Sequence, residues 1–251
     1  MVALAMSARA ADKVSFPSAT DWGEPTKLTG LLNMPSGEGP FPAVVLLHQC
    51  NGMADPVVAQ WAKRLVGWGY VVLRVDSFAP RGLKDVCAYE TKGSYEGDVF
   101  ESDTRVEDAN SGKQFLASLP NVAKDKIGLI GWSHGGAAVL FTLVSEAPKG
   151  PFAAAVALYP GCGVLMAELN APLLIMIGEK DSWSVAAVCQ QLEQPTLGAH
   201  RFERIVYPGA HHGFDEEGAD RKAHGHTVRY DSEAAKDAVN RVKAFLAKHL
   251  K

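Results

Sequence analysis

The chain has 251 residues, 47% of them hydrophobic, and its 25 Lys and Arg residues against 28 Asp and Glu residues give a formal net charge of −3. Charges of both signs are spread along the chain, which argues against a nucleic-acid-binding surface or a polybasic membrane patch. No apolar run is long enough to span a bilayer and no repeat occurs, so we expect one globular domain over residues 12–251 that acts as a monomer or a small homo-oligomer.

The first residues, MVALAMSARAADKV, are similar to the end of a secretory signal but have no charged segment before the apolar one. We expect residues 1–11 to be the remnant of a signal peptide or a disordered tail. The former predicts a periplasmic or secreted protein, and the alternative is a cytoplasmic one. Four cysteines allow two disulfides in an oxidising compartment, with three possible pairings, or buried free thiols in the cytosol.

Short apolar runs alternate with helical patterns along the chain. Residues 12–18 and 26–35 predict a hairpin-like entry, and the later apolar runs predict strands at 41–48, 69–76, 126–132, 152–160, 171–179 and 200–208. Between them, helices are predicted at 56–67, 102–118, 135–145 and 232–250, and residues 77–100 form a long surface loop. This alternation is typical of an α/β protein with a mostly parallel central sheet, here of about eight strands, flanked by helices.

The segment Gly131-Trp132-Ser133-His134-Gly135 matches the G-x-S-x-G pattern of a nucleophile elbow. An apolar strand precedes it and a helix rich in small residues follows it. Glycines allow the tight turn that presents a serine hydroxyl above the edge of the sheet. The alternative is a strand-to-helix turn that contains a serine by chance. We predict that Ser133 is a nucleophile.

A serine nucleophile needs a base and an acid that orients the base. Glu179 and Asp181 follow the strand predicted at 171–179, and His211 and His212 follow the next strand. The order serine, acid, histidine at three strand ends is that of hydrolases with this elbow. Asp181 could instead serve only as a helix cap. A metal site is the weaker interpretation of the nearby polar residues, which are His211, His212, His224, His226, Asp215, Glu216 and Glu217, because no known ligand spacing is present.

We expect the oxyanion hole to consist of two backbone N–H groups, those of His134 and of Cys50 in the segment HQCNGM at 48–53. Cys50 as a nucleophile in its own right is the alternative. We predict no cofactor and no metal, because acyl transfer by a triad needs neither.

These residues together resemble the dienelactone hydrolase family of α/β-hydrolases from about residue 26 to residue 250. The resemblance rests on the stretches VVLLHQCNG, RVDSFAPRG, LIGWSHGG, ALYPGCG, IMIGEKDSW and YPGAHHGFD. It implies a single-domain α/β-hydrolase fold without a large cap domain. It also selects His212, which directly precedes Gly-Phe, and Asp181, which ends the G-x-x-D segment.

The chain departs from the family's type enzymes at several positions. Those enzymes have a cysteine where this chain has Ser133 and a glutamate where it has Gln49. Arg81 lies where they hold an arginine that binds a substrate carboxylate, and a second such arginine has no match here. The combination of Ser133 with the YPGCG segment resembles the exported branch of the family, which implies disulfides Cys50–Cys87 and Cys162–Cys189.

The sequence therefore predicts a serine hydrolase that cleaves carboxylic esters or lactones of small substrates through an acyl-enzyme on Ser133. The loop 77–100, with Phe78, Arg81 and Tyr89, is expected to form a wall of the pocket, unless it is only a solvated connector. The predicted substrate-binding residues are Gln49, Phe78, Arg81, Trp132 and Trp183. The alternatives are a peptidase-like hydrolase with the same triad and a non-catalytic binding protein that retains the fold.

Overall fold

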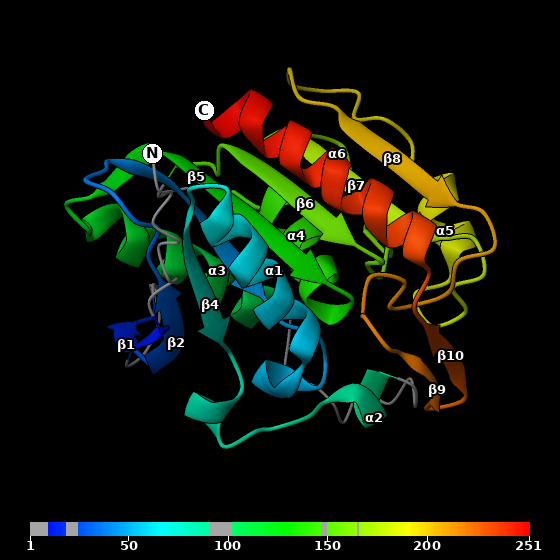
Figure 1. The fold of residues 1–251 in the computed structure, drawn as a ribbon. Coiled ribbons are helices and arrows are strands. Elements are labelled where there is room, and N and C mark those ends of the chain that lie inside the picture. Colours follow the sequence, from blue (N-terminus) through cyan, green and yellow to red (C-terminus); the bar gives the residue numbers. More distant parts are fainter. Residues whose placement is uncertain (1–9, 19–24, 91–101, 147–149, 165) are drawn as a thin grey trace, which may run out of the picture.

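The computed structural model describes residues 10–18, 25–90, 102–146, 150–164 and 166–251. The strands are β1 (Asp12–Pro17), β2 (Lys27–Asn33), β3 (Phe41–Leu47), β4 (Val71–Asp76), β5 (Val122–Trp132), β6 (Ala154–Leu158), β7 (Leu173–Gly178), β8 (Phe202–Tyr207), β9 (Asp220–Ala223) and β10 (His226–Arg229). The α-helices are α1 (Pro56–Gly67), α2 (Cys87–Glu90), α3 (Ser102–Ser118), α4 (His134–Val144), α5 (Ala186–Gln191) and α6 (Ser232–Leu250). They form one α/β domain (Figure 1).

The central sheet has eight strands in the order β1-β2-β4-β3-β5-β6-β7-β8. β1 and β2 form an antiparallel hairpin, and β2 joins β4 antiparallel. All the other neighbouring strands are parallel. Every residue of β6 and β7 is buried, as expected for apolar runs covered on both faces. The predicted mostly parallel sheet is confirmed.

Helices cover both faces of the sheet. Figure 1 shows α1 and α6 in front of it and α3 and α4 behind it. The amino-terminal ends of α1 and α6 are capped by aspartates, because Asp55 accepts the N–H of Val57 and Asp231 accepts the N–H groups of Glu233 and Ala234. The helices predicted at 56–67, 102–118 and 232–250 are confirmed, and the one predicted at 135–145 begins one residue earlier.

The strand order reverses between β3 and β5. The chain runs from β3 outwards to β4 and then returns to β5 on the other side of β3. Such a reversal leaves a crevice at the carboxyl ends of the two strands, where open parallel sheets bind ligands. His48 follows β3 and Ser133 follows β5. The topology therefore directs both segments to one place.

Three short elements depart from the sequence-based expectation. α2, α5 and the strands of the β9–β10 hairpin have only four to six residues each, too few for a hydrophobic period to be recognised. The segment predicted as the loop 77–100 contains a 3₁₀ turn at Ala79–Arg81 and α2. The rest of that loop, 91–100, lies outside the described residues, as does most of the predicted signal remnant 1–11.

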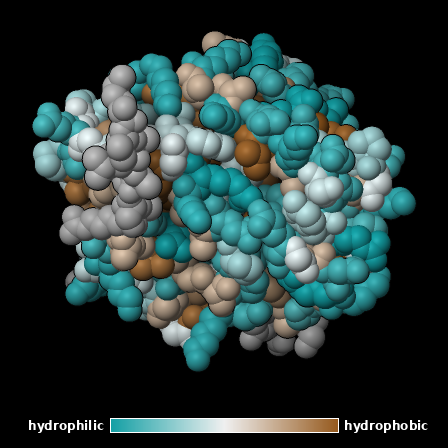
Figure 2. Space-filling view, viewed as in Figure 1, coloured by the Kyte–Doolittle hydropathy of each residue, from teal (hydrophilic) through white to brown (hydrophobic). Residues whose placement is uncertain are grey.

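The surface is largely hydrophilic on the face shown in Figure 2, and its hydrophobic residues form small separate patches. In the described part of the chain, no helix is long and apolar enough to cross a membrane. Within the same residues, the connections between strands carry the helices α1, α3 and α4, which cover the sheet, and otherwise only short elements such as α2 and α5. The crevice at the carboxyl ends of the strands is therefore not covered by a separate domain there.

Candidate active site

Ser133 lies in the tight turn between β5 and α4. Its backbone has φ 50° and ψ −116°, a strained conformation for a non-glycine residue. Its N–H donates to the carbonyl of Leu158 at 2.9 Å. A Cβ at Gly131 would lie 2.1 Å from the carbonyl oxygen of Gly135, and one at Gly135 would lie 2.3 Å from that of Leu47. Only glycine fits at these two positions, as the elbow pattern predicts.

A hydrogen-bonded chain connects Ser133 with the ends of two other strands. The Nε2 atom of His212, which follows β8, lies 3.0 Å from the Oγ atom of Ser133. Its Nδ1 atom lies 2.8 Å from Oδ2 of Asp181, which follows β7. Because an ionised carboxylate only accepts hydrogen bonds, the proton belongs on Nδ1 and Nε2 accepts from the serine. The structure thus brings together the three residues predicted from sequence and selects His212 over His211.

Asp181 also orders the turn that follows β7. Its Oδ1 atom accepts the N–H groups of Trp183 and Ser184, both at 2.9 Å, while Oδ2 contacts His212. Asp181 therefore does not cap α5, whose N-cap is Val185, and its two oxygens separately order the turn and contact His212. All three side chains of the chain Ser133–His212–Asp181 are buried. This burial excludes bulk water from the hydrogen bonds and strengthens them.

The face of His212 is covered by aromatic rings. Tyr159 packs edge-on at a centroid distance of 4.7 Å, and Trp183 lies at 5.1 Å. Behind them, the buried carboxylate of Asp215 accepts three hydrogen bonds, from the ring nitrogens of Trp61 and Trp132 and from the hydroxyl of Tyr159. Burial raises the pKa of Asp215, and the three hydrogen bonds oppose that rise.

The two predicted oxyanion donors belong to the segments that follow β5 and β3. His134 is the first residue of α4, so its N–H belongs to the amino-terminal turn of that helix. Cys50 follows β3, and its carbonyl accepts the N–H of Val86 at 2.8 Å. A disulfide joins Cys50 to Cys87, and another joins Cys162 to Cys189. The predicted pairs are confirmed, and Cys50 has no thiol to serve as a nucleophile.

The side chain of Arg105, from α3, binds both the segment after β3 and the segment after β5. Its Nη1 donates to Nδ1 of His134 at 2.9 Å, and its Nη2 donates to the carbonyl of His48 at 3.0 Å. Burial and the Arg105 charge lower the pKa of His134 to about 3 and hold that of His48 well below its usual value. Both imidazoles are therefore neutral near pH 7. No pattern in the sequence distinguishes Arg105 from a surface residue of α3.

Three of the predicted substrate-binding residues are placed elsewhere. Trp132 is 0% exposed with its ring nitrogen on Asp215, and Phe78 is 1% exposed with its ring 4.4 Å from that of His48. Arg81 donates two hydrogen bonds to the carboxylate of Asp108 and one to the carbonyl of Ser77. The two rings thus fill the interior and the guanidinium binds a carboxylate of the chain, and substrate binding by these three residues stays a prediction. The side chain of Tyr89 lies outside what the structure describes.

Two cavities open at the triad, one on either side of Trp183. The first has a volume of about 280 Å³ and is lined by Ser133, His134, Ala137, Gly161, Trp183 and Ser184. The second, of about 180 Å³, is lined by Gln49, Cys50, Asn51, Asp85, Cys87, Trp183, His212, Arg221, Ala223, His224 and Val228. Gln49 and Trp183 thus lie at the site as predicted, and the amide of Gln49 donates to Asp55 at 2.8 Å.

The β9–β10 hairpin forms one wall of the second cavity and was not foreseen. Its two-residue turn, His224-Gly225, has positive φ at both positions, as a type I′ turn requires. The N–H of Arg229 donates to the carbonyl of His212 at 3.0 Å, so the hairpin also anchors the segment that carries this histidine. Arg221 projects from it and forms a bidentate ion pair with Glu216. Among the described residues, no group of three or more His, Cys, Asp or Glu side chains is arranged to hold a metal ion.

Comparisons with known proteins agree with this architecture. A protein from Synechocystis sp. assigned as a carboxymethylenebutenolidase is 24% identical over 243 residues, which cover 90% of this chain and 93% of that protein. A dienelactone hydrolase-like promiscuous phosphotriesterase from metagenomic libraries superposes with a TM-score of 0.71 at 20% identity, covering 97% of this chain and 100% of that one. An esterase from Pyrobaculum calidifontis gives 0.65 at 17% identity, covering 98% and 88%.

The two structural similarities show the fold alone. The model of the dienelactone hydrolase family matches residues 28–250, which is nearly the whole chain. The chain therefore belongs to the dienelactone hydrolase family of α/β-hydrolases.

Proposed function

We propose that this protein is a serine hydrolase that cleaves carboxylic esters or lactones of small molecules through an acyl-enzyme on Ser133. The observation that carries the proposal is the buried hydrogen-bonded chain from Ser133 through His212 to Asp181. Nucleophile, base and orienting acid lie within hydrogen-bond reach of one another, which is the geometry that activates a hydroxyl at neutral pH.

In the first half of the reaction, the Oγ atom of Ser133 attacks the ester carbonyl while Nε2 of His212 takes its proton. Asp181 holds the imidazole in the required tautomer and stabilises the imidazolium that forms. The N–H groups of His134 and Cys50 bind the oxyanion, and the positive end of the α4 dipole favours the same charge. The tetrahedral intermediate then collapses, and His212 returns the proton to the leaving alcohol.

In the second half, water enters the site and hydrolyses the acyl-enzyme. His212 accepts a proton from the water, which attacks the acyl carbonyl, and the proton then passes to Oγ of Ser133 as the carboxylic acid leaves. In a lactone, alcohol and acid belong to one molecule, so the product is a single hydroxy acid. No cofactor enters either half-reaction.

The test compares the wild type with Ser133→Ala on p-nitrophenyl acetate and butyrate, with Ser118→Ala, a serine at the far end of α3, as the matched control. We expect kcat/KM to fall by a factor of about a thousand or more in Ser133→Ala, because both the nucleophile and the acyl-enzyme are lost. A fluorophosphonate should label the wild type and Ser118→Ala but not Ser133→Ala. Equal activity in all three proteins would remove Ser133 from the mechanism.

We also propose that the protein acts in the periplasm or outside the cell. The support is its two disulfides, which form and persist in oxidising compartments and are rare in the cytosol. Fractionation of the cells that make the protein, followed by thiol labelling without a reductant, tests this. A cytoplasmic protein with four reactive thiols would refute it.

A further inference from the structure

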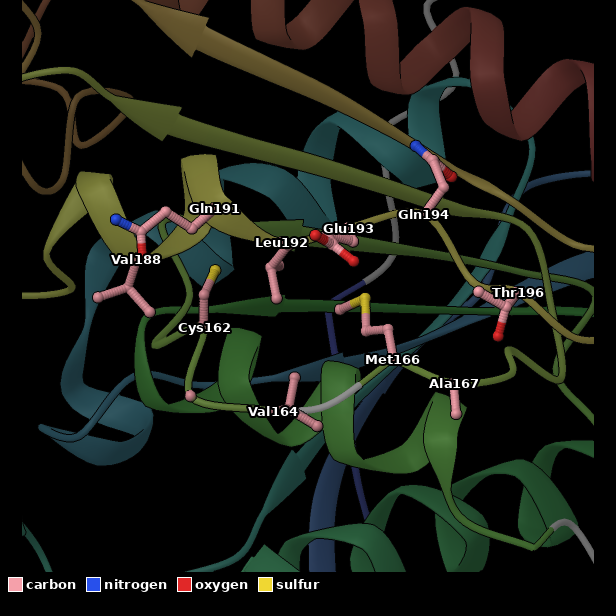
Figure 3. Close-up of a pocket in the computed structure, with 11 residues that line it drawn as sticks. Cys162, Val164, Met166, Ala167, Val188, Gln191, Leu192, Glu193, Gln194 and Thr196 are labelled. Carbon is pink, nitrogen blue, oxygen red and sulfur yellow. The ribbon is translucent and has the colours of Figure 1, made fainter.

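A groove of about 570 Å³ lies beside the catalytic crevice, between α5 and the segments 162–164, 166–167 and 192–196. Figure 3 shows its side chains: Val188 and Leu192 face Cys162, Val164 and Met166 across the groove. The wall near Cys162 includes the Cys162–Cys189 disulfide, which ties α5 to the opposite segment. The groove is therefore mostly apolar, and a covalent link joins its two walls near Cys162.

One of the few large exposed hydrophobic side chains that the structure describes, that of Val188, lines this groove. Within the described part of the chain, the large hydrophobic residues that are exposed are Val185, Val188 and Leu197, and all three lie between residues 185 and 197. Apolar surface left in water costs free energy, so Val188 in the wall of a mostly apolar groove favours contact with an apolar group. The groove thus has the chemistry of a site for an apolar group.

The groove adjoins the cavity that contains Ser133. Gly161 and Ser184 line that cavity, and Cys162 and Val188 line the near end of the groove. Gly161 and Cys162 are consecutive, so one stretch of chain forms the wall of both spaces. In Figure 3, the near end carries Cys162 and Val188, and the far end carries Ala167 and Thr196. A chain attached at Ser133 can pass from the cavity into the groove.

The positions of the two cavities indicate which half of an ester would take this path. His212, which must protonate the leaving alcohol, lines the cavity on the other side of Trp183. That cavity is polar, with Asn51, Asp85 and Arg221 in its walls. The acyl group stays on Ser133, whose cavity opens towards the apolar groove. The acyl half therefore belongs on the groove side and the alcohol half on the polar side.

We propose that the groove along α5 binds the apolar acyl chain of medium-chain esters. This inference rests on the proposed function and specifies its substrate: an ester with an aliphatic acyl chain and a small or polar alcohol. Each methylene fully buried would raise kcat/KM about fourfold. Because the groove is open to solvent, we expect a total rise of about tenfold or more from p-nitrophenyl butyrate to the octanoate.

The test measures the ratio of kcat/KM for octanoate to that for acetate in the wild type, Val188→Asp, Ala167→Trp and Leu197→Asp. Val188 is 40% exposed, so a charged side chain there leaves the core intact. An acyl chain that packs against it would have to remove water from the carboxylate, which costs free energy. Leu197 is 59% exposed and does not line the groove, which makes it the matched control. Ala167→Trp fills the far end of the groove and should shorten the longest acyl chain accepted.

A fall of about fivefold or more in the ratio for Val188→Asp, with the ratio of Leu197→Asp unchanged, is the expected result. Unchanged ratios in Val188→Asp and Ala167→Trp, at full acetate activity, would overturn the groove and leave the proposed function standing. Octanoate binding to Ser133→Ala, measured by calorimetry with butyrate as comparison, separates the two claims. If the protein binds octanoate and Val188→Asp weakens that binding, but the wild type hydrolyses no ester, the proposed function is overturned and the groove stands.

Discussion

At the residue scale, the site is supported by a buried carboxylate, that of Asp215, which contacts neither Ser133 nor His212 directly. Asp215 joins Trp132, next to Ser133, to Tyr159, which packs on His212. A carboxylate suits this position because it accepts hydrogen bonds from all three donors around it and donates none. The nucleophile and the base thus share one buried support.

We expect Asp215→Asn to lower the free energy of unfolding by about 1–3 kcal/mol, because a neutral amide oxygen accepts the two indole N–H groups more weakly than a carboxylate does and the NH₂ group cannot accept from the Tyr159 hydroxyl. Urea denaturation at pH 7 measures this loss. The matched control is Asp220→Asn, which removes an exposed carboxylate paired with Arg229 and should change stability by less than about 0.5 kcal/mol. Equal effects of the two substitutions would contradict the support role of Asp215.

At the element scale, the elbow depends on how closely α4 approaches the ends of β3 and β5. A Cβ at Gly135 would collide with two backbone carbonyls, those of Leu47 at 2.3 Å and His48 at 2.6 Å. Backbone atoms of a central strand cannot move aside as a flexible side chain can. The helix and the strand must therefore separate if residue 135 carries a side chain.

We expect Gly135→Ala to destabilise the protein by about 3 kcal/mol or more, beyond the usual cost of an overpacked core side chain. Thermal unfolding and soluble yield measure this effect. Gly161→Ala is the control, because a Cβ there would meet its nearest atom, Cβ of Ala137, at 3.9 Å, an ordinary contact. Equal melting temperatures for the two variants would show that the elbow tolerates a wider helix–strand spacing than the structure has.

At the scale of the whole molecule, two buried neutral histidines make stability depend on pH. The pKa of His134 falls from 6.5 to about 3 and that of His48 also falls, in both cases mainly through burial. A lowered folded-state pKa means that the unfolded chain binds more protons between the two values. Their contribution to stability is therefore complete above pH 6.5 and is lost as the pH falls towards the folded-state values.

His134→Asn removes one of these groups and keeps a side-chain oxygen that can accept the hydrogen bond from Arg105. Between pH 6 and pH 4, the free energy of unfolding should fall less steeply in this variant, by about 1.4 kcal/mol per pH unit. Guanidinium denaturation curves across this range measure the slope. Parallel pH dependences for variant and wild type would show that His134 binds a proton in the folded protein.

The amino-acid sequence by itself predicted the parallel sheet, the positions of the main helices and the three residues that meet at the crevice. Apolar runs, caps and glycines are local signals, and the carboxyl ends of parallel strands lie at one edge of the sheet. The elbow glycines could be recognised because their backbone conformation depends on immediate neighbours. The disulfide pairs, implied by the family resemblance, were also found.

Only the tertiary structure decided where the longer side chains point. Trp132 and Arg81 adjoin the site in sequence, but their partners, Asp215 and Asp108, lie 83 and 27 residues away. The β9–β10 hairpin lacks apolar periodicity and is held by its contact with the His212 segment. The apolar groove lies where the Cys162–Cys189 disulfide joins α5 to a segment 27 residues away. Each of these features depends on contacts between distant segments, which no local pattern records.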